Sequence, residues 1–347
     1  MVLEFVKGLR KKMEKTIEMR KYEVIKKYMS RLDEDNLLTN TYIHYTSINS
    51  AFAILDGDAF WASNVRFSND ETEEKMLQLE NSSERDDYII CFCTENDMLS
   101  QWRGYCHNGG VAIKLNLGYT QQYSILHADY EESGKYITYF NTPLPVIYLN
   151  NKDKSTKVRR NMEQDISSTY NTSYITIEDM LPYLKNGHFR EEREVRMEFS
   201  NKGESLSKCI RFRTLQDGVK VPYIVVKHGD AGKMQGSCAT EIEQYDDDKI
   251  MQMSTHKEII WIEEGNDQEK KYYDMVTHIE DFKKRNNWEK PVKILCKGRL
   301  PVEKITVAPT YDRNRKAEQI KRFCQSKYWL RNVVVEVSDI PYIQPQL

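Results

Sequence analysis

A histidine inside an apolar segment is the first feature of this sequence that could do chemistry. His44 lies in TYIHYT, a run with the alternation of a β-strand, and Thr46 and Ser47 follow it directly. A histidine that faces inward at a strand end can act as a metal ligand, a base or a hydrogen-bonding group, and the two hydroxyls can cap the next helix. The segment therefore predicts a corner that presents His44 to a ligand.

A second segment, HFREEREVRMEF at residues 188–199, combines charges with the alternation of a strand. One face would carry Glu192, Glu194, Arg196 and Glu198, and the other would carry Val195, Met197 and Phe199. The charges fit a solvated face with cross-strand ion pairs. Alternatively, Arg196 or Arg193 holds Glu194 in a cleft, where its carboxylate stabilises a developing positive charge.

A third segment, SQWRGYCHNGG, has the composition of a binding loop. Ser100, Trp102, Arg103 and Tyr105 follow a predicted strand, and two glycines then permit close backbone approach. The two aromatic side chains, three residues apart, could plug the core. They could also stack on a planar heterocycle, including a cationic pyridinium such as nicotinamide.

Several classes of site lack their usual motifs. Cys91 and Cys93 with Cys106 and His107 resemble metal ligands, but no second closely spaced pair supports them, so we expect no metal and small core thiols instead. The sequence also lacks GxGxxG, GxxxxGK[ST], HExxH and GxSxG. These absences argue against Rossmann, P-loop, zincin and hydrolase sites.

Composition indicates a cytoplasmic protein without a membrane span. The 347 residues carry a net charge of −2, so the chain as a whole has no electrostatic footprint for nucleic acid. The seven cysteines are scattered, the apolar runs are short, and the beginning of the chain does not resemble a secretory signal.

The three segments must be positioned by a mixture of strands and short helices. Residues 1–32 form a basic amphipathic pattern, which predicts a helix packed on its own domain, on a second copy of the chain, or on a partner or anionic surface. A single domain then spans residues 40–347, with a charged helical insertion at about 229–290. Strands at CIRFRT and VPYIVVK are expected to pair with the strand in 188–199, and a helix is expected over SNDETEEKMLQLE. The pattern predicts an α+β fold rather than a doubly wound parallel sheet.

The motifs HYTS, FSNDETE, CFCTENDMLSQWRGY, GGVAIKL, FREEREVR, ITVAPT and SDIPY together resemble a bacterial family of unknown function, DUF2971. Some members of this family are described as abortive-infection phage-resistance proteins of the AbiGi type. The resemblance covers about residues 40–345 and implies a role in antiviral defence. It supplies no reaction.

The order of the motifs is also similar to that in ADP-ribosyltransferases of the His-Tyr-Glu type. This likeness implies a mixed, largely antiparallel split β-sheet sandwich with peripheral helices, which uses NAD as a substrate. It implies that His44 and Thr46 hold the adenosine ribose, that Tyr105 stacks on nicotinamide, with Ser100 opening its helix, and that Glu194 binds the nicotinamide ribose, with Glu192 as the alternative carboxylate. Tyr45 departs from the usual small residue after the histidine. The expected catalytic residues are His44, Tyr105 and Glu194, and the expected NAD-binding residues are His44, Tyr45, Thr46, Ser47, Ser100, Trp102, Arg103, Tyr105, Glu192 and Arg196.

Two other functions compete with the transferase. The same cleft could bind a nucleotide or a phage component without catalysis, while a partner or antitoxin protein supplies the activity. A nuclease is the third hypothesis, although the sequence shows no paired carboxylates of the two-metal kind. Under the transferase hypothesis the partners are NAD and a macromolecular acceptor, and the N-terminal helix could mediate a homo-oligomer.

Overall fold

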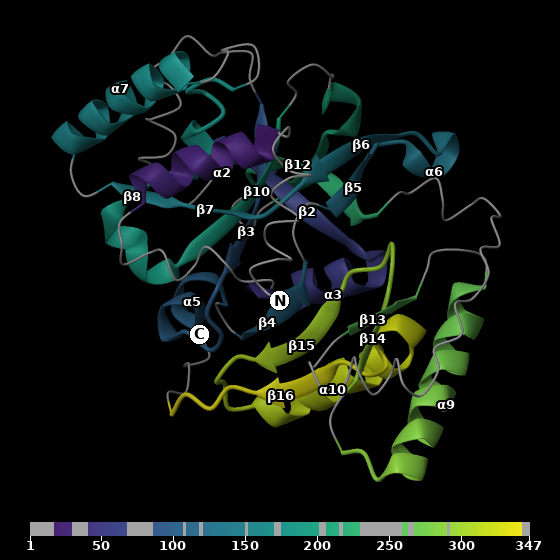
Figure 1. Ribbon diagram of the computed structural model, residues 1–347. Coiled ribbons are helices and arrows are strands. Elements are labelled where there is room, and N and C mark those ends of the chain that lie inside the picture. Colours follow the sequence, from purple (N-terminus) through teal and green to yellow (C-terminus); the bar gives the residue numbers. More distant parts are fainter. Residues whose placement is uncertain are drawn as a thin grey trace.

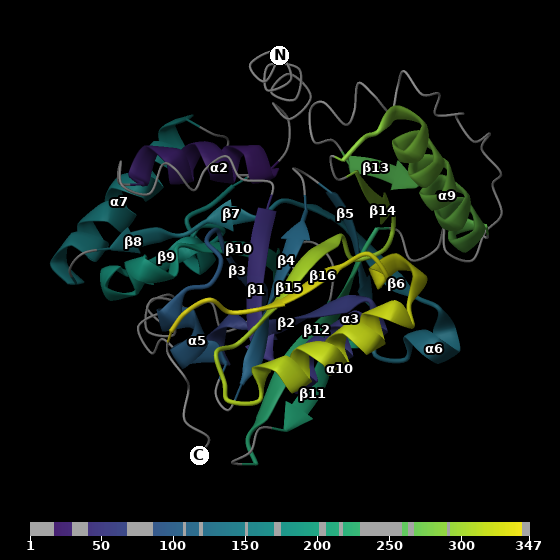
Figure 2. The same cartoon turned by 90° about the horizontal axis from the view of Figure 1, so that it is seen from below.

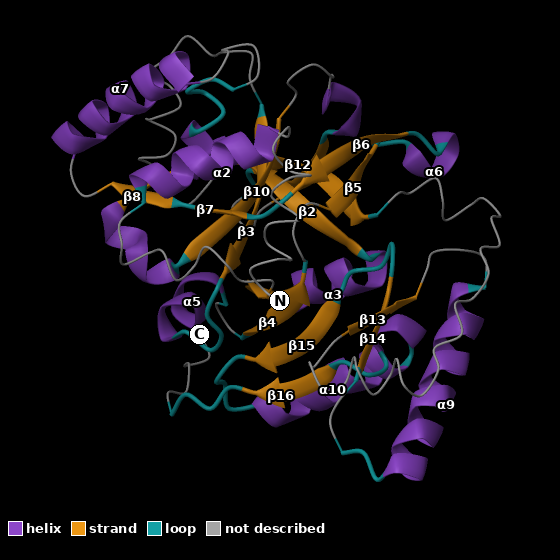
Figure 3. Ribbon diagram, in the orientation of Figure 1, coloured by secondary structure: helices purple, strands orange, loops and turns teal. Residues whose placement is uncertain are grey.

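The computed structural model describes residues 17–29, 41–67, 86–106, 109–117, 121–149, 152–169, 175–200, 206–214, 218–229, 259–262, 267–289 and 292–341. Strands and helices alternate irregularly along the chain (Figure 3). The described helices are α2 (Ile17–Tyr28), α3 (Ile48–Gly57), α5 (Leu99–Tyr105), α6 (Tyr130–Ser133), α7 (Lys152–Thr169), α9 (Gln268–Asn286) and α10 (Arg313–Gln325). The described strands are β1 (Thr41–Ser47), β2 (Ala59–Asn64), β3 (Asp87–Cys93), β4 (Gly110–Asn116), β5 (Gln121–Leu126), β6 (Tyr136–Asn141), β7 (Leu144–Pro145), β8 (Ile147–Leu149), β9 (Leu184–Asn186), β10 (Glu194–Ser200), β11 (Arg211–Thr214), β12 (Lys220–His228), β13 (Ile259–Ile262), β14 (Lys293–Cys296), β15 (Val302–Val307) and β16 (Val334–Val337).

One large, open and largely antiparallel sheet forms the centre of the molecule. Its strand order is β16-β15-β4-β1-β3-β2-β12-β5-β6, with β10 along β3, β7 along β10 and β11 along β12. The pair β15 and β16 is parallel and is connected by α10. The predicted α+β class with a mixed, largely antiparallel sheet is confirmed.

The sheet splits along one edge of β3. Among the described residues, β1 pairs with β3 at Cys93 alone, whereas β2 pairs with it at Tyr88 and Ile89. The intervening residues Ile90–Phe92 therefore face a gap, because β1 and β2 diverge there. The opposite edge of β3 is fully paired with β10. This divergence opens the space in which the candidate site lies.

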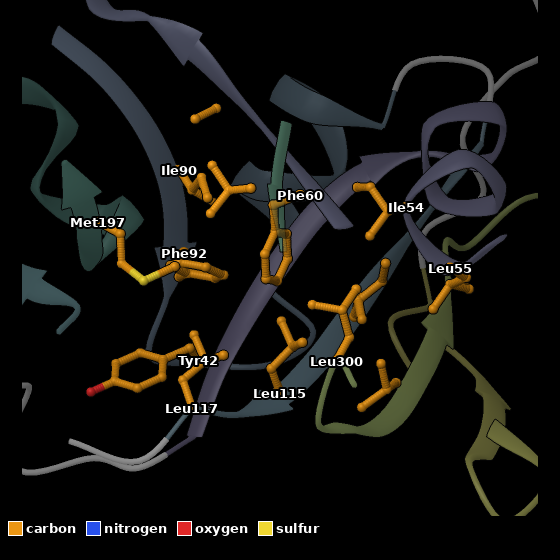
Figure 4. Packing of buried hydrophobic residues seen from close by; sticks show 14 of the residues in the cluster. Tyr42, Ile54, Leu55, Phe60, Ile90, Phe92, Leu115, Leu117, Met197 and Leu300 are labelled. Atoms are coloured by element: carbon orange, nitrogen blue, oxygen red, sulfur yellow. The ribbon is translucent and has the colours of Figure 1, made fainter. Parts of the chain in front are cut away.

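Both halves of the split sheet contribute to one hydrophobic core. Strands β1 and β4 supply Tyr42 and Leu115, while β2 and β10 supply Phe60 and Met197. Figure 4 shows these side chains converging around Phe92 of β3. Helices α3 and α10 also bury apolar residues in this cluster. A shared core holds the two halves together at the split, since burial of apolar surface is the main favourable contribution to folding.

The strand pairing expected for residues 188–199 was wrong. Strands β11 and β12 pair with each other, and β12 continues to β2 and β5. Strand β10 instead pairs with β3 and β7. Alternation identified these segments as strands but does not specify their neighbours. Because β1 and β2 share one edge of β3, the whole opposite edge is available to β10.

The N-terminal helix packs on its own chain. Val24 and Ile25 of α2 are buried in a second cluster with Leu144, Ile147 and residues of α7. Lys21 of the same helix makes a buried ion pair with Glu198 of β10 at 2.7 Å. Figures 1 and 2 show α2 and α7 together on one side of the sheet, away from α9. Helix α2 covers residues 17–28 of the amphipathic pattern, while residues 1–16 lie outside the described part of the chain.

The predicted charged insertion contains more than a helix. Strands β13 and β14 form a parallel pair connected by α9, with their own cluster around Tyr272 and Phe282. The sequence pattern predicted helix throughout this insertion and did not reveal β13, a short apolar strand.

The helix expected at residues 68–80 lies outside the described residues. Residues Leu181–Tyr183 form a 3₁₀ turn with Pro182 near its start. None of the described helices is long and apolar enough to cross a membrane.

Gly110 sits where β4 passes close to its neighbours, and we expect Gly110→Ala to destabilise the fold. A Cβ atom there would lie 2.7 Å from Cys106 Sγ and closer still to the Thr46 carbonyl oxygen. Overpacking of this kind costs about 1–3 kcal/mol. Urea denaturation checks the change, with Gly57→Ala as the control because its added Cβ would meet nothing within 4 Å. Equal midpoints for the two variants would contradict the expectation.

His228 should make folding sensitive to acid. Burial lowers the pKa of His228 from 6.5 to about 4, against the raising effect of a backbone hydrogen bond at Arg299. The unfolded chain therefore binds the proton first, so the free energy of unfolding should fall as the pH drops from about 6.5 to about 4. Denaturation at several pH values should give a shallower dependence for His228→Asn. An unchanged dependence would assign the acid sensitivity to other groups.

Candidate functional site

A cleft of about 270 Å³ lies at the split in the sheet. Its lining comes from β1, β2 and β3, from α3 and α5, and from the segment between Lys185 and Arg196. This volume lies just below the usual range for small-molecule sites, roughly 300–1,000 Å³. The lining includes residues from all three segments that the sequence singled out.

The side chain of His44 bridges β1 and β3 at the edge of the cleft. Its ring packs edge-on against Phe60 and Phe92, with centroids 6.0 and 5.9 Å away. The Nδ1 atom lies 2.9 Å from the carbonyl oxygen of Cys91. A carbonyl only accepts, so Nδ1 carries the proton. Burial lowers the pKa of His44, and this hydrogen bond raises it to a smaller extent. The lowered pKa favours the neutral ring, in which Nε2 is an acceptor.

The residues around His44 divide between the cleft and the framework. Thr46 lines the cleft. Ser47 instead caps α3, accepting a hydrogen bond from the Ser50 backbone N–H at 3.2 Å. Tyr45 also borders the cleft, but its hydroxyl accepts from the Met98 backbone N–H at 3.0 Å. The expected helix cap after the histidine is thereby confirmed for Ser47.

Helix α5 presents Tyr105 to the cleft and buries Trp102. Trp102 is 1% exposed, packs edge-on against Tyr45 and donates from Nε1 to Asp97 at 2.7 Å. Tyr105 is 36% exposed and donates to Glu192 Oε1 at 3.3 Å. Of the two interpretations, the core role fits Trp102 and the ligand-facing role fits Tyr105. Among the described residues, the cleft lining does not include Ser100 or Arg103.

A buried ionic cluster forms the other wall of the cleft. Arg196 donates from Nε to Glu194 Oε1 at 2.6 Å and from Nη2 to Oε2 at 3.0 Å. Lys185 Nζ lies 2.6 Å from Glu194 Oε2 and 2.6 Å from Glu192 Oε2. The Glu194 backbone N–H donates to Tyr148 at 2.8 Å. The cluster thus joins β9 and β10 to the 3₁₀ helix Gly187–Glu192 that lies between them.

The two carboxylates of this cluster differ in their surroundings. Burial would raise the pKa of Glu194, but Arg196 and Lys185 hold it well below its usual range. Burial raises the pKa of Glu192, with Lys185 acting in the opposite direction. The side chain of Glu192 is 12% exposed, against 4% for Glu194. Glu194 is an ionised group locked by its donors, and Glu192 is the more accessible carboxylate.

The expected charged strand face is therefore not a solvated one. Glu194, Arg196 and Glu198 are 5%, 1% and 4% exposed; Glu198 pairs with Lys21 of α2, while Glu194 and Arg196 border the cleft. Glu192 lies outside the strand, because the strand begins only at Glu194, after Arg193 takes a left-handed conformation. Their charges are tolerated at these positions because each of the three glutamates has a cationic partner.

No group of three or more His, Cys, Asp or Glu residues in the described part of the chain could hold a metal ion. Cys91 and Cys93 lie on the same strand face as Arg196 and Glu194, their β10 partners. Burial raises the pKa of both thiols well above the ordinary value.

Comparison with known proteins gives one family match. Residues 101–197 match the model of a family described as protein of unknown function (DUF2971). This match supports the resemblance that the motifs predicted. No curated protein and no solved structure gave a significant match.

The DUF2971 match includes the ionic wall of the cleft and Tyr105, while His44 lies before it. It also includes two residues of the site that sequence reasoning missed, Lys185 and Tyr148. Tyr148 lies in a polar, tyrosine-rich stretch, residues 118–180, in which no motif stands out, and Lys185 follows shortly after it. The signal that could have found Lys185 is its place in a short apolar segment, LPYLK, just before the charged strand, where a buried lysine needs a carboxylate.

Proposed function

We propose that this protein is a cytoplasmic ADP-ribosyltransferase-like effector of antiviral defence that binds NAD in the cleft. One observation carries the proposal: His44, Tyr105 and the Glu192–Glu194 pair, distant in sequence, line the same cleft at the split in the sheet. These are the residues that the likeness to His-Tyr-Glu transferases selected. Three ordered landmarks meeting at one site is what a shared function predicts.

Each landmark has a chemical role in the proposed site. The Nε2 atom of neutral His44 accepts a hydrogen bond from a ribose hydroxyl, since Nδ1 is committed to Cys91. Tyr105 offers its ring to the cationic nicotinamide. A nearby carboxylate stabilises the positive charge that develops on the ribose.

The proposed reaction breaks the bond between C1′ of the nicotinamide ribose and the nicotinamide nitrogen. The bonding electron pair leaves with nicotinamide, which becomes neutral, and positive charge develops on the ribose carbon and ring oxygen. A nucleophile of a macromolecular acceptor then attacks C1′ and loses its proton. A fixed carboxylate accelerates this step because it interacts more strongly with the developing cation than with the ground state.

Glu192 is the better candidate for this carboxylate. Both oxygens of Glu194 already accept hydrogen bonds from Arg196, and one also accepts from Lys185. Glu192 shares only Lys185 with that cluster and faces Tyr105. We therefore assign Glu192 to the reacting ribose and treat Glu194 as a positioning residue that fixes Lys185.

The full pairing of Glu194 favours a second candidate function, a nucleotide-binding module without catalysis. In that case the ionic cluster only shapes the cleft, and a partner protein supplies the activity. Binding of NAD without turnover is the distinguishing result.

The test is to incubate the purified full chain with NAD, with and without a bacterial lysate as a source of acceptors. Released nicotinamide is quantified by chromatography, and NAD binding is measured by calorimetry. We expect nicotinamide release by the wild type and by Glu132→Gln, a control at an exposed position of α6. NAD binding without nicotinamide release would favour the binding module. If the protein showed no binding and no release, both functions would be excluded.

A defence role rests on the resemblance to abortive-infection proteins. It predicts that expression of the chain reduces phage yield and that a Glu192→Gln variant loses this effect. Equal phage yield with and without the chain would remove the defence assignment and leave the cleft chemistry to its own test.

A further inference from the structure

Arg213 of β11 occupies the part of the cleft formed by β2. Its Nη2 donates to the Ser63 hydroxyl at 3.0 Å, and both residues line the cleft together with Trp61. The Nε atom is buried and has no hydrogen-bond partner in the described structure. The Nε atoms of Arg211 and Arg299 are also unpartnered in the described structure, but of the three arginines only Arg213 lines the cleft. A buried, unsatisfied N–H of a charged group is costly, so at this position an acceptor on a bound ligand would be favourable.

The other two cations of the cleft are already neutralised. Arg196 and Lys185 both contact Glu194, and Lys185 also contacts Glu192. Among the described residues, no carboxylate pairs with Arg213. The cleft therefore has an electrostatically balanced end, at the ionic cluster, and an end where a positive charge faces an open space.

We infer that Arg213 and Ser63 form an anion subsite that takes the phosphates of a nucleotide bound in the cleft. The planar guanidinium can donate two parallel hydrogen bonds to phosphate oxygens, and the hydroxyl can add a third. Trp61, two residues before Ser63 on β2, lies on the same strand face and offers a ring for stacking a base. The inference extends the proposed function: the subsite itself is argued for any nucleotide, and only its assignment to the phosphates of NAD rests on the proposed function.

The experiment compares ligands that differ only in phosphate. Calorimetry on the full chain measures ADP, inorganic pyrophosphate and adenosine against wild type, Arg213→Ala and Arg213→Lys. Arg211→Ala is the matched control, because Arg211 lies on the same strand, bonds the His127 carbonyl oxygen and does not line the cleft in the described structure. Thermal melting verifies that each variant is folded.

We expect Arg213→Ala to weaken ADP binding by about 10- to 100-fold, the effect of losing a hydrogen bond from a charged group. Adenosine affinity should be unchanged, Arg213→Lys should lie between, and Arg211→Ala should bind as the wild type does. Failure of the wild type to bind ADP or pyrophosphate would overturn the inference, as would equal losses for ADP and adenosine. Arg213-dependent ADP binding in a protein that does not cleave NAD would retain the subsite and reject the transferase.

Discussion

Glu192→Gln is expected to lower the rate of nicotinamide release by about 10²- to 10³-fold, the range found when one preorganised electrostatic contact to a transition state is removed. The substitution keeps the shape of the side chain and removes its charge. Glu192 is partly accessible, so the fold should lose little stability. Stopped reactions analysed by chromatography measure the rate, and the wild-type rate should fall on the acid side with an apparent pKa above the 4.5 of an ordinary glutamate.

Glu194→Gln serves as the contrasting variant. It leaves Arg196 and Lys185 without their shared counter-charge inside the protein, so its main effect should be a lower midpoint of denaturation. If Glu194→Gln remained as stable as wild type and lost all nicotinamide release, while Glu192→Gln stayed active, the two assignments would have to be exchanged.

Lys21→Met is expected to destabilise the protein by roughly 3–5 kcal/mol, because it removes the cation of a buried ion pair and leaves the charge of Glu198 in the interior. The pair is deeply buried, with side chains 7% and 1% exposed. Replacing both partners, as Lys21→Met with Glu198→Leu, should recover most of the loss, since two apolar side chains need no counter-charge. Urea denaturation of the wild type, both single variants and the double variant completes the cycle.

The cycle also tests whether α2 is held to β10 by this contact. A loss of less than about 1 kcal/mol in both single variants, the range of exposed pairs, would mean that the pair behaves as a surface salt bridge and that water reaches it. Lys27→Met is the control, because Lys27 on the same helix pairs with Asp165 at the surface.

Local sequence patterns predicted the elements better than their arrangement. The alternation in TYIHYT and VPYIVVK identified β1 and β12, and the hydroxyl after His44 correctly predicted the cap of α3. The partners of β10 could not be predicted in the same way, because each strand edge offers similar hydrogen-bonding groups. Only packing around the split selects β3 for one edge of β10.

The candidate site shows the same division. His44, Tyr105 and the glutamates stood out because each breaks the local pattern of its segment. Lys185 and Arg213 did not, since a charged residue in a short strand usually faces solvent. Their importance comes from residues that the fold brings beside them, such as Glu194 and Ser63, and a single sequence carries little information on such distant contacts.

Asp97 accepts hydrogen bonds from Trp102 and from the Ser338 hydroxyl, at 2.7 and 2.5 Å, and from the Asp339 backbone N–H at 3.0 Å. The loop that leads into α5 is therefore anchored by residues synthesised about 240 positions later. At roughly 5–20 residues per second of translation, the nascent chain spends many seconds without this anchor. Tyr105 lies in the helix that this loop leads into, so a growing chain lacks one set of contacts that position this helix until residues 338 and 339 have been made.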